Sequence, residues 1–254
     1  MIKAILARIS QGHRTMKYPK EPPVLPELFR GYPLLKPENC PPGCRRCLEV
    51  CPTGAISGNG SLSLDLGKCL FCPECSQVCG HAAISFSTDY QLAANRREDL
   101  IVHADEEQKL ARALDKKMRS LFGRSLKLRE VSAGGCNGCE ADVNVLGTLA
   151  FDLGRFGIQF VASPRHADGI LVTGPVTKNM QAALLKTYDA IAAPKIVIAS
   201  GACAINGGPF IDSPEARNGV DGLLPVDLYI PGCPPHPITI LDGLLRLLGK
   251  IEQG

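Results

Sequence analysis

Twelve cysteines are the residues of this 254-residue chain best suited to chemistry. The N-terminus has no long apolar stretch followed by a small-residue cleavage site, so we expect a reducing cytoplasm. Disulfides belong mainly to oxidising compartments, and ligation of metal by thiolates is therefore expected in their place. Twelve thiolates match the requirement of three 4Fe–4S clusters, at four ligands each.

Eight of the cysteines form two runs in the first half of the chain. The second run has the full C-x2-C-x2-C-x3-C spacing of a bacterial ferredoxin, and the first ends in the matching C-x2-C-x3-C-P pattern. In such runs three thiolates hold one cubane and the fourth reaches the neighbouring cubane. The spacing predicts two 4Fe–4S clusters, one held by Cys40, Cys44, Cys47 and Cys79, and the other by Cys69, Cys72, Cys75 and Cys51.

The two runs belong to an internal repeat, in which three cysteines of the first run recur 28 residues later. Neither copy has a core of its own, so the two are expected to fold together around metal as a small α+β domain. The first run departs from the ferredoxin pattern, because three residues separate Cys40 from Cys44 where two are usual. Zinc is the lesser alternative here, since zinc ribbons use paired C-x2-C motifs.

The other four cysteines lie far apart in the second half. That half alternates apolar runs of strand length with helical segments, which predicts an α/β fold with a parallel sheet covered on both faces. The expected strands are 126–131, 158–162, 169–174, 195–200 and 226–232, and the expected helices are 139–153, 178–192 and 236–248. Loops at the carboxyl ends of parallel strands converge on one crevice. A third cluster is therefore expected there, held by Cys136, Cys139, Cys203 and Cys233.

A charged stretch separates the two halves. Residues 96–119 carry 13 Asp, Glu, Lys or Arg side chains, with apolar residues at helical spacing. Asp105 is placed to cap the start of a helix and Gly123 to end it. We expect three parts, namely a ferredoxin-like domain with an N-terminal extension over 1–95, a helical connector over 96–123 and the α/β domain over 124–254.

Charge and motif content exclude several classes of function. The net charge of +3 is not gathered into a basic stripe, so no nucleic acid partner is expected. No window approaches the roughly 20 apolar residues of a membrane span. P-loop, dinucleotide-fingerprint and HExxH motifs are absent, so no nucleotide is expected either. The chain is expected to move electrons for chemistry that takes place elsewhere.

Longer motifs resemble known families. "TMKYPKEPPVLPELFRGYP", ahead of the two runs, resembles the ferredoxin-type subunit of respiratory complex I and of membrane-bound NiFe hydrogenases such as formate hydrogenlyase. "GGCNGCEADV", "KIVIASGACAINGGPF" and "DLYIPGCPPHPITILDGL" resemble the small subunit of those hydrogenases and the related 20 kDa subunit of complex I. The chain therefore resembles two usually separate subunits fused into one.

The resemblance implies the fold and the setting. The expected fold class is α/β, with a flavodoxin-like C-terminal domain after a small bacterial-ferredoxin-like domain. The implied partners are a NiFe large subunit, integral-membrane subunits that translocate ions, and an electron donor. The chain would lie peripherally on the cytoplasmic face of the cell membrane, held by the membrane subunits. Two residues separate Cys136 from Cys139, as in the hydrogenases, whereas the complex I subunit has adjacent cysteines.

Two alternatives stay open. The first keeps the fold and changes the reaction, to that of a complex I-like ferredoxin:quinone oxidoreductase or a nickel-free relative of the hydrogenases. The second is a ferredoxin fused to a zinc-stabilised binding domain.

Two further features have a functional and a structural interpretation each. Glu140 follows the ligand pair, where it is either a proton relay with a raised pKa or a first-turn carboxylate favoured by the helix N-terminus. The first 18 residues place four apolar side chains on one side of a helix with basic residues between them. That helix would contact a membrane subunit or the headgroup surface, or simply pack on the protein.

Overall fold

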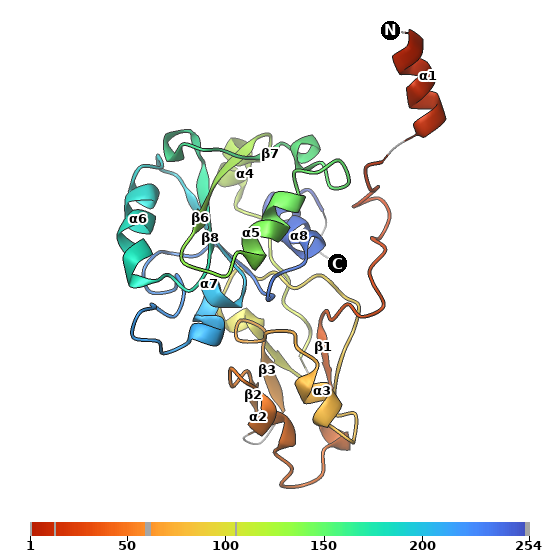
Figure 1. Cartoon of the computed structure of the whole chain (residues 1–254), viewed down its shortest axis with the longest axis vertical. Coiled ribbons are helices and arrows are strands. Elements are labelled where there is room, and N and C mark those ends of the chain that lie inside the picture. Colours follow the sequence, from red (N-terminus) through yellow and green to blue (C-terminus); the bar gives the residue numbers. More distant parts are fainter. Residues whose placement is uncertain (1, 13, 59–61, 105, 252–254) are drawn as a thin grey trace.

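The computed structural model describes residues 2–12, 14–58, 62–104 and 106–251, which form a larger and a smaller body (Figure 1). The larger body contains the second half of the chain, and the smaller body contains the two cysteine runs. Asp105, the expected helix cap, lies outside the described residues.

A five-stranded parallel sheet forms the centre of the larger body. Its strands are β6 (Leu126–Ser132), β7 (Ile158–Phe160), β8 (Gly169–Thr173), β9 (Ile196–Ser200) and β10 (Leu228–Ile230). The spatial order is β7-β6-β8-β9-β10, with every neighbouring pair parallel. This is the flavodoxin-like order. Every residue of β8 and β9 is buried, which explains why the strands are continuous apolar runs in the sequence. The expected fold class of this half is confirmed.

Helices follow the strands of this sheet. They are α5 (Gly138–Val145), α6 (Lys178–Asp189), α7 (Ala202–Asn206) and α8 (Pro237–Leu247). α5 is shorter than the expected 139–153, because the Thr148 hydroxyl and backbone N–H both bond to the Val145 carbonyl and turn the chain. The short α7 was not expected at all.

The smaller body repeats its structure as it repeats its sequence. Its helices α2 (Arg46–Val50) and α3 (Glu74–Val78) begin 28 residues apart. Its strands are β1 (Pro33–Leu35), β2 (Ile56–Ser57), β3 (Ser63–Asp65), β4 (Ile84–Phe86) and β5 (Ile101–His103). β1 pairs with β4, and β3 pairs with both β2 and β5, all antiparallel. The small α+β region rich in cysteines is thus confirmed.

The expected helical connector is largely absent. Among the described residues of 96–123, the one α-helix is α4 (Lys116–Phe122), with the Asp115 side chain accepting from the Met118 N–H at its start and Gly123 at its end. The residues just before it, 107–115, form no regular secondary structure, because their amides bond elsewhere: Ala111 N–H donates to the Ala93 carbonyl at 2.7 Å, and Leu114 N–H to that of Leu247 at 2.9 Å. Tertiary hydrogen bonds have overridden the helical periodicity.

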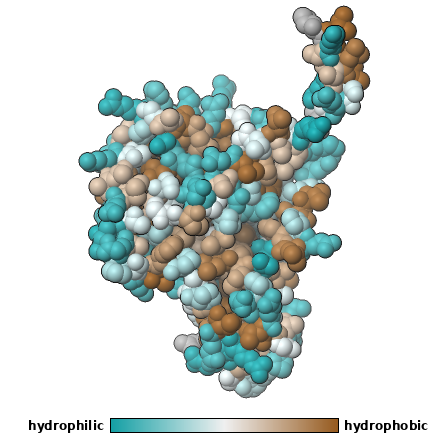
Figure 2. Space-filling view, viewed as in Figure 1, coloured by the Kyte–Doolittle hydropathy of each residue, from teal (hydrophilic) through white to brown (hydrophobic). Residues whose placement is uncertain are grey.

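The N-terminal segment has two contrasting parts. Helix α1 (Ile2–Gln11) projects away from the body, with no residue buried (Figure 1). Hydrophobic side chains gather along one side of α1, where no other described part of the chain covers them (Figure 2). The following segment returns to the larger body, where the buried Tyr18 hydroxyl donates to Asp242 of α8 at 2.7 Å and Arg155 donates to the Tyr18 carbonyl at 2.9 Å. The extension is therefore fixed to the α/β body, although the cysteine runs follow it in sequence.

Candidate metal centres

The smaller body brings its eight cysteines together in two sets. One cavity is lined by Cys40, Cys44, Cys47 and Cys79, and another by Cys51, Cys69, Cys72 and Cys75. Each set takes three thiols from one run and one from the other, because α2 and α3 lie side by side and exchange the cysteines at their C-terminal ends. This is the arrangement that the ferredoxin spacing predicts.

Backbone N–H groups point at the thiols of both sets. Ala83 N–H donates to the Cys79 sulfur at 3.3 Å, and Ala55 N–H to that of Cys51 at 3.2 Å. At Cys79, burial acts to raise the pKa, but donation from several backbone N–H groups outweighs it and leaves the pKa below its ordinary value. Such donors favour the thiolate form that binds iron, so the cavities suit anionic sulfur ligands.

At the innermost thiols burial outweighs the backbone N–H donors, so the pKa rises. It raises the pKa of Cys69 to about 12, and burial with neighbouring thiols raises that of Cys75 to about 11. A bound metal must replace those protons, because iron binds the thiolate and not the thiol.

The third set lies at the carboxyl edge of the parallel sheet. Cys136 follows β6, Cys139 is in the first turn of α5, Cys203 is in α7 and Cys233 follows β10. The four are close enough to act on one another: burial first, and then Cys233 and Cys136, raise the pKa of Cys203 to about 12. The sheet topology thus assembles cysteines that are far apart in sequence. Cys136 and Cys233 are exposed, whereas Cys203 is buried.

Two glycines leave room around these sulfurs. A Cβ on Gly201 would lie 2.5 Å from the Cys139 sulfur, and one on Gly208 would lie 2.9 Å from that of Cys203. Both glycines have positive φ, at +93° and +53°, which other residues rarely adopt. The local backbone is therefore shaped around the thiols.

The donor sets fit 4Fe–4S clusters, since the two cavities of the smaller body each offer four thiols, N–H donors and mostly apolar walls. The third set offers four thiols beside two glycines. Within the described ranges, no three His, Cys, Asp or Glu side chains meet as they would around one metal ion.

The three sets lie in series through the molecule. Cys47 of the first set acts on the pKa of Cys75 in the second. Cys72 of the second set contributes, after burial and Cys136, to the raised pKa of Cys233 in the third. Cys72 and Cys233 also line one open cavity between the two bodies. The second set is thus the intermediate of the three.

Two carboxyl groups, those of Glu140 and Glu130, lie near the third set. Glu140 is 6% exposed and accepts from the Thr173 hydroxyl at 2.7 Å. Burial acts to raise its pKa, but hydrogen bonds from Ser132 and Thr173 outweigh burial and lower it, so the expected raised pKa is wrong. The raised pKa belongs to Glu130 of β6, where burial and repulsion by Glu140 raise it to about 7.

Sequence reasoning missed Glu130. It lies in a strand among alternating residues, six positions before Cys136, and nothing in that pattern distinguishes it from a solvated side chain. Its Oε1 atom is buried with no hydrogen-bond partner among the described residues.

Comparison with known proteins finds relatives of the second half of the chain. The family described as "NADH ubiquinone oxidoreductase, 20 Kd subunit" matches residues 136–247. A probable membrane-bound hydrogenase subunit mbhJ from Pyrococcus furiosus is 42% identical over 143 residues, which are 55% of this chain and 86% of the relative.

Two further relatives come from different complexes. Formate hydrogenlyase subunit 7 from Escherichia coli is 46% identical over 51% of this chain, which spans only 51% of that relative. A subunit of the NADH-quinone oxidoreductase of Carboxydothermus hydrogenoformans is 49% identical over 45% of this chain and 70% of its own length. Among the described residues, no helix is both long and apolar enough to cross a bilayer.

Proposed function

Because the chain belongs to the family of the NADH:ubiquinone oxidoreductase 20 kDa subunit, we propose that it is the electron-transfer subunit of a membrane-bound hydrogenase. It would relay electrons between a donor protein and the NiFe centre of a partner large subunit. The family itself binds a 4Fe–4S cluster and includes subunits of oxidoreductase complexes. The observation that carries the finer proposal is the series of three thiol sets, from Cys47 through Cys75 and Cys72 to Cys233.

The residues of this chain would hold three 4Fe–4S clusters, with the ligand sets Cys40, Cys44, Cys47 and Cys79; Cys51, Cys69, Cys72 and Cys75; and Cys136, Cys139, Cys203 and Cys233. Such a group supplies reversible one-electron transfer, without bonds made or broken in a substrate. The protein fixes the thiols, excludes water from the inner ones by burial, and directs N–H groups at their sulfurs.

The exposed side of the third set is the proposed contact with the large subunit. Cys136 and Cys233 are exposed there, and a cluster at that position needs cover from bulk water to deliver electrons to a partner. Attachment to the cytoplasmic face of the membrane would be peripheral, through integral-membrane subunits that translocate ions.

The competing function is that of a complex I-like ferredoxin:quinone oxidoreductase or a nickel-free relative. The similarity to a component of a quinone oxidoreductase keeps that reaction open. The Cys136 and Cys139 spacing favours the hydrogenase, because the quinone reductases resembled by this chain carry adjacent cysteines at this position.

The test is hydrogen evolution by the complex purified through a tag on this chain. With a low-potential donor, the hydrogenase proposal predicts evolution of hydrogen and nickel in the complex. Quinone reduction without hydrogen evolution or nickel would establish the competing function and overturn the proposal.

A further inference from the structure

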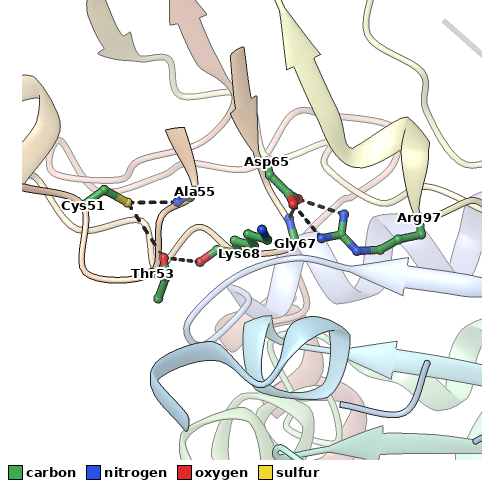
Figure 3. A network of polar contacts seen from close by, with 7 residues as sticks. All are labelled: Cys51, Thr53, Ala55, Asp65, Gly67, Lys68 and Arg97. Carbon is green, nitrogen blue, oxygen red and sulfur yellow. Dashed lines mark hydrogen bonds and ion pairs between the residues drawn. The ribbon is translucent and has the colours of Figure 1, made fainter. Parts of the chain in front are cut away.

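An ion pair joins the smaller body to the segment that leads out of it. Arg97 donates from both terminal nitrogens to Asp65, at 2.8 Å and 2.6 Å (Figure 3). Both side chains are mostly buried, at 23% and 16% exposed. A two-bond pair of this kind fixes orientation as well as distance, which a surface pair does not.

On one side, Asp65 shapes the loop that carries a proposed ligand. Its carboxylate accepts from Gly67 N–H at 2.9 Å, and its backbone carbonyl accepts from Cys69 N–H at 3.0 Å. The Asp65 side chain thus holds the turn that ends at Cys69.

The same turn also supports a ligand from the other run. The Lys68 carbonyl accepts from the Thr53 hydroxyl at 2.7 Å, and that hydroxyl lies 3.8 Å from the Cys51 sulfur (Figure 3). Through this turn, Asp65 therefore supports two of the four cysteines in the second set, Cys51 and Cys69.

On the other side, Arg97 follows a segment fixed to the parallel sheet. Ala94 exchanges both backbone hydrogen bonds with Tyr229 of β10, at 2.8 and 3.0 Å, and the Asn95 amide donates to the Asp227 carbonyl at 2.9 Å. β10 leads directly to Cys233 of the third set.

A second contact joins the Asp65 turn to the larger body at Gly67. A Cβ on Gly67 would lie 2.8 Å from both the Arg97 guanidinium and the Ile205 side chain of α7. α7 is the helix that carries Cys203. The Asp65 turn is therefore packed directly between the guanidinium and the third set's helix.

We propose that Asp65 and Arg97 are positioning residues that hold the second thiol set in a fixed relation to the third. The inference rests on the proposed function, because it concerns the step between the second and third clusters. The pair does this without touching either cluster: Asp65 orders the Cys51 and Cys69 loops, and Arg97 ties Asp65 to the strand before Cys233. Electron transfer between the second and third clusters requires a constant distance between them, and the pair itself transfers no proton and makes or breaks no covalent bond.

The experiment compares variants of the assembled complex. Arg97→Ala removes the pair, Arg97→Lys keeps the charge without the two-bond geometry, and Arg96→Ala is the matched control. Arg96 is the adjacent arginine, and its contact with Glu98 is 3.9 Å long between largely exposed side chains. Two readouts are followed: amide hydrogen exchange at Gly67 and Cys69, and the magnetic interaction between the second and third clusters in the EPR spectrum of the reduced complex.

For Arg97→Ala we expect amide exchange at Gly67 and Cys69 to rise about tenfold or more, as the loss of charge-assisted hydrogen bonds implies. The inter-cluster splitting should weaken or broaden while the iron content stays at the parental value. Arg97→Lys should fall between this variant and the parent, and Arg96→Ala should equal the parent.

Parental exchange and splitting in Arg97→Ala would overturn the inference. If Arg97→Ala does not assemble, Asp65→Asn provides the same test, because its amide oxygen still accepts from Gly67 N–H while the charge pair is lost. A parent complex without three iron–sulfur signals would instead refute the proposed function, so the two failures are distinguishable.

Discussion

At the scale of single residues, the environment drives the pKa values of two neighbouring carboxyl groups apart. Hydrogen bonds from Ser132 and Thr173 outweigh burial to keep the pKa of Glu140 low, while burial and the Glu140 charge raise that of Glu130 to about 7. Near neutral pH Glu140 is therefore an ionised carboxylate and a weak proton acceptor, whereas Glu130 has a pKa at which it can take up or release a proton.

We predict that Glu140→Gln leaves hydrogen turnover of the assembled complex within a factor of two of the parent, because a carboxylate with a lowered pKa is a weak proton acceptor near neutral pH. The substitution keeps the shape and the Thr173 hydrogen bond but removes the negative charge. Reduction of the clusters by an artificial donor should be unchanged, which separates proton from electron supply. Glu140 then acts as a helix-end carboxylate, whose loss costs about 0.3–1 kcal/mol of stability. A fall in turnover of about 100-fold, the loss typical of a missing acid–base group, would contradict this and make Glu140 a proton relay.

Glu130 makes the stability of the protein depend on pH. Folding raises its pKa from 4.5 to about 7, so the protonated form is favoured in the folded state and stability is lost as pH rises through that window. Glu130→Gln cannot ionise and avoids this loss. We expect the variant to be more stable than the parent at pH 8, by about 1 kcal/mol after allowance for partial solvent access, and equal to it at pH 4. Thermal unfolding at both pH values measures this, and an equal difference at both would contradict it.

Among the helices and strands, the sequence predicted the two repeated cysteine runs and the alternation of strands with helices. The ferredoxin spacing predicts that Cys79 serves the first cluster and Cys51 the second, and each of the two lines the corresponding cavity, whereas ligation itself stays a prediction. Burial on both faces makes β8 and β9 largely apolar, so these strands, and the cysteine that follows β9, could be predicted from the sequence. α7 was not visible, since a five-residue helix carries no periodicity.

The connector shows why other elements could not be predicted. Its apolar residues have helical spacing, but Ala111 bonds to Ala93 and Leu114 to Leu247, contacts that exist only in the folded molecule. The Asp65–Arg97 pair is invisible for the same reason, because 32 residues separate its members.

At the scale of the whole molecule, the two bodies share packing. Buried residues of the smaller body and of the sheet belong to one continuous apolar cluster, and Tyr18 is buried against α8. The domain boundaries, 1–95, 96–123 and 124–254, stay a prediction, and they group the residues by proposed metal site.

Replacement of one third-site ligand tests whether the bodies bind metal separately. We predict that Cys203→Ser abolishes the EPR signal of the third cluster and preserves the other two, because its thiol contributes to no other set. Cys203 is buried in α7, so folding is followed by circular dichroism in the same samples. Loss of all three signals in a folded variant would show that the metal sites assemble as one unit.

Metal analysis joined to EPR of the reduced protein tests whether this chain holds three 4Fe–4S clusters in series. We predict about 12 irons and no zinc per chain, since each of three thiol sets takes four irons. We also expect three signals, with the second cluster coupled magnetically to both others, because Cys47 is near enough to act on the pKa of Cys75, and Cys72 on that of Cys233. About eight irons with one zinc per chain, and only two coupled signals, would contradict this prediction and establish a ferredoxin joined to a zinc-stabilised domain.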